Sequence, residues 1–225
     1  MGFVTIQNYT TKKPLELIGE EAGCCWGANT SNEENNNKRG LACLESEHGR
    51  TLEFPQVYMV LDGYSARVIR ELYTHIGGAP TRLSASTRYI DYKDFEYVIP
   101  LSISENEERA SVYERCVNSI SESLKLLEAL GTPREDLAML LPLAMTQKCV
   151  VRTNLRQLID MSHQRLCTRA NHEFRGLMRD IMQALKDYSP EWEYIVTNYF
   201  KAKCDYLGWC PEKNSCGKHE KKEEF

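Results

Sequence analysis

The sequence contains no apolar run near the roughly 18–20 residues that a membrane-spanning helix needs. It also has no excess of positive charge, because 28 Lys and Arg residues face 32 Asp and Glu residues, which gives a net charge of −4. A chain-wide basic surface for nucleic acid is therefore excluded, although a local basic pocket is not. Residues 1–8 lack the charged-then-apolar layout of a signal peptide. We expect a cytoplasmic protein that binds neither membrane nor nucleic acid.

The cysteines do not form the dense, even-numbered framework of a small secreted protein. There are nine in 225 residues, and six of them are scattered between Cys24 and Cys167. A reducing cytosol keeps such thiols free, and we assign Cys24, Cys25 and Cys43 no role. The other three lie close together near the C-terminus.

Apolar residues recur at strand or helix spacing through most of the chain. Strands are predicted at 3–6 and 57–61, with a strand or extended connection at 90–100. Helices are predicted at 15–22, 65–75, 107–130, 132–141, 153–167 and 170–186, followed by a last apolar block at 192–200. The pattern indicates an α/β fold whose C-terminal half is mainly helical.

No clean linker interrupts the chain before about residue 203. A chain of 225 residues is long enough to bury a sizeable core. We therefore expect one α/β domain over residues 1–203 and a Cys-rich, charged tail over residues 204–225.

Capping residues and polar segments complete the predicted outline. Residues 29–40 are nearly devoid of apolar side chains, which predicts a mobile surface loop. Thr132 precedes Pro133 at the start of one helical pattern, and Thr153 precedes another. Both threonines are expected to be N-cap residues.

A flexible turn at Gly77-Gly78 begins a segment rich in hydroxyl groups that also contains Arg82 and Arg88. Small residues let backbone approach a ligand, hydroxyls bond phosphate oxygens, and arginine binds them bidentately. The segment lacks the Gly-Lys-Ser/Thr of a Walker loop. It is either a phosphate-binding loop or an ordinary loop with surface arginines.

A second set of polar residues lies on the predicted C-terminal helices. Arg152, Arg156 and His163 fall near one helix face, and Glu173 and Arg175 lie a turn or more beyond. Such runs are commonly solvated charges. Against that interpretation stands the number of Arg, Asn and His residues mixed into apolar helices of a protein that is acidic overall.

The tail contains Cys204, Cys210 and Cys216 at intervals of six, followed by His219. Three thiolates and an imidazole suit a structural zinc ion. The spacing differs from the Cys-x2–4-Cys of common zinc modules. A disulfide and three free thiols at a disordered terminus are the alternatives.

The motifs of the two polar regions occur in a characteristic order. Residues 135–148 are followed by Asn154-Leu-Arg156, by His163-Gln-Arg165, and by a run that ends in Asn-His-Glu-Phe-Arg175; Asp62-Gly-Tyr-Ser-Ala-Arg lies earlier. In this order they resemble the flavin-dependent thymidylate synthases. That family has a leucine-proline helix start, Asn-x-Arg, x-x-Arg and Ala-Gln-x-Glu-Ile-Arg, and earlier Glu-Gly-x-Ser-Arg. The similarity covers roughly residues 3–190.

The central signature of that family, which begins Arg-His-Arg, is altered in this chain. His75 has lost both flanking arginines, and two residues are inserted before Ser86-Thr-Arg88. Arg82 lies in the insertion region, where it can replace a lost guanidinium. Lys148 replaces an arginine, which keeps the charge but loses the bidentate fork. Other departures are Phe54 for His, Glu71 for Gln, Ser84 for Glu and Asn171 for Gln.

The resemblance implies an antiparallel sheet surrounded by helices and an FAD-dependent thymidylate synthase, which is a methyltransferase. Such an enzyme converts dUMP to dTMP, with methylenetetrahydrofolate as carbon donor and NADPH as reductant. It further implies a homotetramer with its active sites at subunit interfaces.

Carried over residue by residue, the resemblance also implies site residues. Those for dUMP are Glu71, Arg82, Ser84, Ser86, Arg88, Lys148 and Arg175, and those for FAD are His75, His163, Arg165 and Asn171. Arg175 would contact the uracil as the catalytic residue. The altered signature leaves two alternatives, namely a related flavin-dependent enzyme that modifies C5 of a pyrimidine nucleotide, for example by hydroxymethylation, and a non-catalytic flavin- or nucleotide-binding protein.

Overall fold

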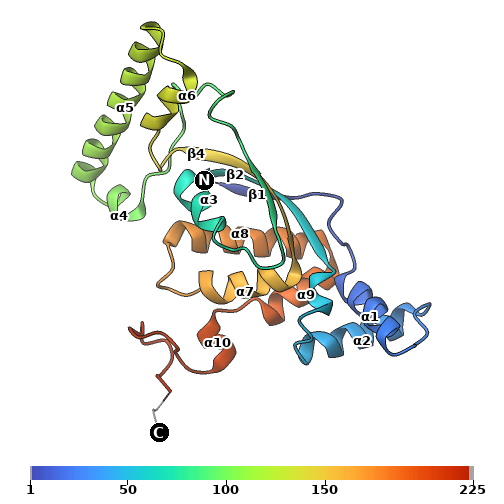
Figure 1. The fold of residues 1–225 in the computed structure, drawn as a ribbon. Coiled ribbons are helices and arrows are strands. Elements are labelled where there is room, and N and C mark those ends of the chain that lie inside the picture. The colour runs from blue at the N-terminus through green and yellow to red at the C-terminus, as the bar shows by residue number, and fades with distance from the viewer. Residues whose placement is uncertain (1, 223–225) are drawn as a thin grey trace. The chain divides into compact units, whose positions relative to one another are not determined.

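Four strands form one antiparallel sheet in the order β1-β2-β4-β3 (Figure 1). The computed structural model describes residues 2–222, so the last three residues of the expected tail lie outside the described part. The strands are β1 (Phe3–Ile6), β2 (Gln56–Ser65), β3 (Thr81–Ser84) and β4 (Thr146–Asn154). The α/β class with an antiparallel sheet is confirmed. Within residues 2–222, no helix combines the length and the apolar character needed to cross a bilayer.

The chain divides into two compact units. Unit 1 consists of Met1–Phe3, Leu61–Thr74 and Leu83–Cys149. Unit 2 consists of Val4–Val60, His75–Arg82 and Val150–Phe225. The boundary between the units crosses all four strands.

Unit 1 contains one long helix. This helix is α5 (Glu107–Ala129), and it packs against α4 (Leu101–Ser104) and α6 (Arg134–Leu137). The unit also contains α3 (Ala66–Leu72), whose first turn is capped by the hydroxyl of Ser65. Its buried core consists of Phe95, Val117, Leu124, Leu137 and Met145.

The predictions for unit 1 have mixed outcomes. The helix predicted at 107–130 is confirmed, and the helix at 132–141 is shorter, since α6 ends at Leu137 and a 3-10 turn follows. The expected cap, Thr132, is wrong, because Pro133 is the N-cap of α6. The N–H of Thr132 instead donates a hydrogen bond to the carbonyl of Leu127 at 3.1 Å, beyond the end of α5. Residues 90–100 form an extended connection with a single bridge, from Tyr97 to Met145.

Unit 2 contains the remaining helices. They are α1 (Pro14–Cys25), α2 (Glu33–Glu45), α7 (Leu155–Arg165), α8 (His172–Tyr188), α9 (Pro190–Tyr199) and α10 (Lys203–Leu207), with a 3-10 turn at Thr51–Glu53. Figure 1 shows α7 and α8 side by side, and α9 packs on α8. The indole N–H of the buried Trp192 donates to the carbonyl of Thr11 at 2.7 Å. This bond ties α9 to the segment that follows β1.

The N-terminus of α7 is capped by Asn154. Its side-chain oxygen accepts from the N–H of Gln157 at 2.9 Å. The expected cap, Thr153, is wrong because β4 continues through Asn154 and buries Thr153 inside the strand. A β-branched residue suits this strand position, and asparagine is preferred over threonine as an N-cap.

Residues 29–40, predicted as a mobile loop, largely belong to helix α2. The helix packs backbone to backbone on α1, because Gly19 and Gly40 have no Cβ. A Cβ on Gly40 would lie 2.0 Å from the carbonyl oxygen of Leu15, and one on Gly19 would lie 1.8 Å from that of Asn36. Arg39 donates to the carbonyl of Gly19 at 2.6 Å. Close backbone approach and polar bonds therefore replace apolar side chains, which is why hydrophobic periodicity gave no helix signal.

Gly40→Ala should lower the free energy of unfolding by about 1–3 kcal/mol, the usual range for overpacking. The new methyl group cannot fit against the carbonyl of Leu15 unless α1 and α2 separate. Urea denaturation measures the effect. Gly176→Ala is the control, because its Cβ in α8 meets nothing within 4 Å and alanine favours helix by up to about 1 kcal/mol. Equal stability of the two variants would contradict the close approach.

Candidate active site

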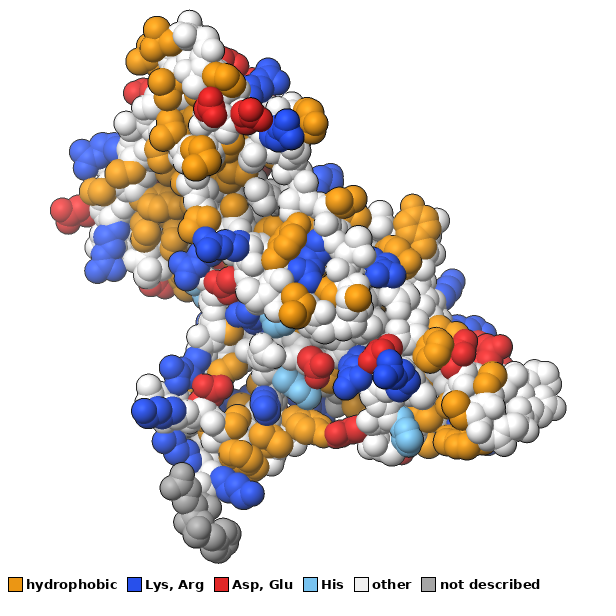
Figure 2. Space-filling model, in the orientation of Figure 1, with side chains coloured by type: hydrophobic (Ala, Val, Ile, Leu, Met, Phe, Trp, Pro, Cys, Tyr) orange, Lys and Arg blue, Asp and Glu red, His pale blue; other side chains and the backbone are white. Residues whose placement is uncertain are grey.

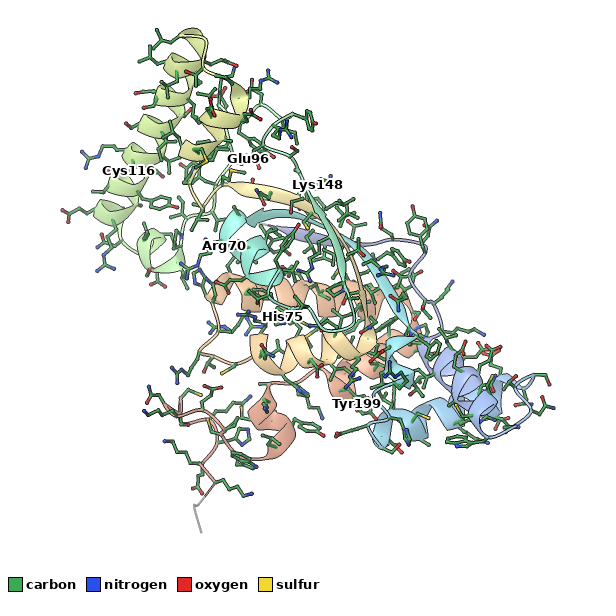
Figure 3. All side chains as sticks on the ribbon, in the orientation of Figure 1. Arg70, His75, Glu96, Cys116, Lys148 and Tyr199 are labelled. Carbon is green, nitrogen blue, oxygen red and sulfur yellow. The ribbon has the colours of Figure 1, made fainter. Side chains whose placement is uncertain are left out.

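A buried histidine in unit 2 is held by two arginines. Nε of Arg165 donates to Nε2 of His75 at 2.8 Å, and a guanidinium N–H of Arg82 donates to the carbonyl of His75 at 2.6 Å. The guanidinium of Arg165 also lies 4.4 Å above the ring of Phe174. We term His75, Arg82, Arg165 and Phe174 the histidine cluster. In Figure 3, His75 lies beside the helix pair α7 and α8 of the same unit.

The surroundings of His75 keep its ring neutral. Burial is the largest cause, and the positive charges of Arg165 and Arg82 add to it, so the pKa of His75 falls to about 4. Because Nε2 accepts a hydrogen bond from Arg165, the single ring proton is on Nδ1. The cluster therefore presents one neutral imidazole donor at physiological pH.

The Gly77-Gly78 turn packs directly on the start of α7. A Cβ on Gly77 would lie 2.1 Å from Oε1 of Gln157, and a Cβ on Gly78 would lie 2.2 Å from Nδ2 of Asn154. Gly78 also has a φ of 69°, which disfavours side chains. Arg152 donates to the carbonyl of Ala79 at 3.1 Å. The predicted flexible turn is thus tied to the sheet and to the cap of α7.

His163 contributes a polar atom without a partner. Its Nε2 is buried and has no hydrogen bond within residues 2–222. Burial is also the main cause that lowers the pKa of His163. The ring stacks on Tyr206 with centroids 5.0 Å apart, and it lines two open cavities of about 550 and 470 Å³. A buried polar atom without a partner is uncommon in folded proteins and marks the surroundings of His163 for a functional role.

Two other predicted site residues in unit 2 have local backbone partners. Asn171 is the N-cap of α8, and its side-chain oxygen accepts from the N–H groups of Glu173 at 2.9 Å and Phe174 at 3.3 Å. The guanidinium of Arg175 donates to the carbonyls of Thr168 and Ala170. These bonds fix the loop between α7 and α8.

In unit 1, several residues of the predicted phosphate site lie at the end of β3 and on the neighbouring strand. The hydroxyl of Ser84 is 3.1 Å from that of Tyr73, and the N–H of Ala85 donates to the carbonyl of Lys148 at 2.8 Å. Figure 3 labels Lys148 on β4. Ser86 accepts from the N–H of Arg88 at 3.2 Å. We term Ser84, Ser86, Arg88 and Lys148 the hydroxyl cluster.

Both cations of the hydroxyl cluster have carboxylate partners. Arg88 lies 3.3 Å from Glu135, and Lys148 lies 2.9 Å from Asp62. The first pair is largely exposed, with side chains 66% and 61% accessible, so it adds little stability and exchanges readily. Glu71, also predicted for the substrate, pairs with Arg67 at 3.5 Å.

Sequence reasoning missed Phe174, Tyr73 and the two carboxylates. The contact between Arg165 and the ring of Phe174 could not be predicted from the spacing of residues in the sequence, because the turn between two helices brings the two side chains together. Asp62 and Glu135 stand inside quoted motifs, but only the fold pairs them with Lys148 and Arg88. Arg82, predicted for the substrate, instead contacts the backbone of His75 in the histidine cluster.

These features agree with the comparison to known proteins. Residues 6–191 match the family model described as "Thymidylate synthase complementing protein". The chain therefore belongs to this family, the flavin-dependent thymidylate synthases, and the resemblance seen in its motifs is confirmed.

Similar relatives bear that name. The flavin-dependent thymidylate synthase of Pyrococcus abyssi is 30% identical over 93% of this chain and 89% of its own. That of Nitratidesulfovibrio vulgaris is 26% identical over 93% of this chain and 92% of its own. The crystal structure of the Helicobacter pylori enzyme complexed with FAD and dUMP superposes with a TM-score of 0.67 at 19% identity, covering 88% of this chain and 100% of that one. This last match supports the fold.

His75 should remain neutral well below the pH at which histidines usually titrate. Its folded pKa of about 4 lies below the ordinary 6.5, so the unfolded chain binds a proton that the folded chain excludes. The resulting stability is complete above pH 6.5 and is lost as the pH falls toward 4, by about 3 kcal/mol. NMR of the imidazole nitrogens measures the titration.

Arg165→Leu provides the comparison for this titration. It removes one of the two cations and should raise the pKa of His75. If the pKa of His75 in the wild-type protein is near its ordinary value of 6.5, the buried contact between His75 and Arg165 is contradicted.

Proposed function

We propose that the protein catalyses the reductive methylation of dUMP to dTMP, with FAD as cofactor, methylenetetrahydrofolate as carbon donor and NADPH as reductant. The observation that carries this proposal is the family match over residues 6–191. Two clusters of suitable polar residues, one in each unit, support it from the structure.

The residues of unit 2 fit a flavin. His163 lines the cavities and has a buried Nε2 without a hydrogen-bond partner in the described residues, and His75 offers a neutral ring held by Arg165. His75, His163, Arg165 and Asn171 would hold the cofactor. Bound FAD supplies the hydride chemistry, while the protein supplies binding and orientation. Asn171 acts through the cap of α8, which sets the loop ahead of Phe174.

The residues of unit 1 suit a phosphate dianion. Ser86 and Arg88 would bind the phosphate of dUMP, with Lys148 near them and with Ser84 and Glu71 in supporting positions. Arg82, which the resemblance also carries over for dUMP, belongs to unit 2 and contacts the backbone of His75. Binding exchanges the exposed contact between Arg88 and Glu135 for a charge-assisted fork on phosphate. Arg175 would contact the uracil, where a fixed positive charge stabilises the negative charge that develops in the transition state.

The proposed assembly is a homotetramer in the cytoplasm with active sites between subunits. The assembly rests on the family resemblance, and the location is supported by nine cysteines that are all free thiols. Light scattering on the purified protein measures the subunit number directly.

Rescue of a thymidine-requiring bacterial strain tests the reaction. We expect expression of the chain to permit growth without thymidine and the purified protein to carry a flavin spectrum. Soluble, yellow protein that fails to rescue growth would contradict the synthase and favour another C5-modifying enzyme. Soluble protein without flavin would contradict both.

Arg88→Ala should weaken dUMP binding to the holoenzyme at least about thirtyfold. Truncating one partner of a charge-assisted pair costs about 2–5 kcal/mol, and 1.4 kcal/mol is tenfold in affinity. Glu135→Gln should tighten binding modestly, because it removes the carboxylate that competes for Arg88. Calorimetry measures both affinities.

The control for this measurement is Arg115→Ala, which removes the same charge from an exposed position on α5. It should leave dUMP affinity within about twofold, since exposed charges contribute little. Equal losses in Arg88→Ala and Arg115→Ala would place the phosphate elsewhere.

A further inference from the structure

The C-terminal segment of unit 2 brings metal-binding side chains together. The sulfur of Cys204, a carboxylate oxygen of Asp205 and a ring nitrogen of His219 all lie within 4.8 Å of one another. Cys204 and Asp205 belong to the first turn of α10, whereas His219 returns to them from beyond the last turn. The chain therefore closes on itself at these groups, which are outside both clusters assigned to the reaction.

Asp205 orients the histidine in this group. Its Oδ1 lies 2.8 Å from Nε2 of His219, and its Oδ2 lies 2.7 Å from Nζ of Lys218. A carboxylate that binds one ring nitrogen of a histidine commonly directs the other nitrogen at a metal. Asp205 is thus suited to be a positioning residue, which leaves Nδ1 of His219 as the ligating atom.

Two more thiols of the segment line the same cavity as Cys204. Cys210 and Cys216 both belong to the wall of the 550 Å³ cavity. The N–H of Cys210 donates to the carbonyl of Glu220 at 2.8 Å, which sets Cys210 beside the residue that follows His219. The sulfurs of Cys210 and Cys216 lie outside the group of ligand atoms that are within 4.8 Å of one another. Residues 211–219 contain no helix or strand, so binding would draw this segment, with Cys210 and Cys216, toward Cys204 and His219.

We propose that Cys204, Cys210, Cys216 and His219 bind one structural zinc ion with tetrahedral geometry. Three thiolates and one imidazole form a donor set that zinc takes in closed sites. The intervals are longer than in common zinc knuckles, and Gly208 and Gly217, with φ of 77° and 87°, supply the turns that longer loops need. Four protein ligands leave no open position, so the ion has no catalytic role.

The charges of the segment suit such a site. Each thiol releases its proton on binding, because zinc takes the thiolate, and the complex then carries one net negative charge. Lys218 lies on Asp205 beside the site, and Lys203 lines the same cavity. Figure 2 shows further Lys and Arg side chains gathered around this end of unit 2.

The ion would fasten the tail to the loop between α7 and α8. Arg169 of that loop donates to the carbonyl of Asn214 at 2.7 Å, and Tyr206 stacks on His163. Asn214 and Tyr206 both belong to the segment 204–219, so both contacts depend on the position of that segment. Zinc would therefore support the wall that His163 forms without being needed for the core of unit 2.

Metal analysis of the full-length protein, purified without a histidine tag, tests the site. We expect about one equivalent of zinc per chain, and less than about a tenth would overturn the proposal. Replacement of zinc by Co²⁺ should give the strong absorption of tetrahedral cobalt with thiolate ligands, and weak octahedral bands would overturn it. Bound iron with the colour of an iron–sulfur cluster would also overturn it. Such clusters are held by four cysteines, and Cys167 lines the same cavity as the three proposed cysteine ligands.

Single serine variants test the ligand set. Cys210→Ser should reduce bound zinc at least tenfold, with an unchanged circular dichroism spectrum and faster tryptic cleavage of the tail. Cys167→Ser is the matched control, because Cys167 lines the same cavity but is outside the proposed set, and it should keep a full equivalent. Retained zinc in Cys210→Ser, or lost zinc in Cys167→Ser, would overturn the assignment. The cobalt spectrum of the wild type decides the question if a variant fails to fold.

Discussion

The candidate site of unit 2 depends on one hydrogen bond between side chains 90 positions apart, from Nε of Arg165 to Nε2 of His75. This bond fixes the tautomer of the histidine and joins the segment that follows α3 to the end of α7. Arg165 holds its own position by lying on the face of Phe174, whose ring is also 5.7 Å from that of His75. A buried histidine between two cations is stable only in its neutral form, so the geometry and the charge state of this site are set together.

The positive charges around His75 come from distant parts of the chain. Arg82 reaches the carbonyl of His75, and Arg165 reaches its ring. Because Arg165 lies at the end of helix α7, its hydrogen bond holds the ring in one orientation.

Strong periodicity allowed much of the fold to be predicted from the sequence. The long α5 and the buried β2 bury regular apolar faces, and both were found. Helix α2 was missed because it is stabilised by two glycines and by polar bonds such as that of Arg39, which no apolar pattern records. For the site, motif order pointed to Ser86, Arg88 and His75. The partners that set their charges, among them Glu135 and Phe174, come from distant positions and required the fold.

The backbone contact between α1 and α2 has a consequence for how this region tolerates mutation. The exposed positions of α2 should accept exchange among helix-forming residues at little cost, whereas its buried Asn36, Cys43 and Leu44 should not. Gly40 of α2, like Gly19 of α1, is also restricted, because each faces a carbonyl oxygen of the partner helix and no larger residue fits. A library of random substitutions across residues 33–45 should therefore be tolerant at the exposed positions and intolerant at the buried Asn36, Cys43 and Leu44. Gly40, which has no side chain to bury, should be as intolerant as these core positions, because its place is taken by the backbone of the partner helix.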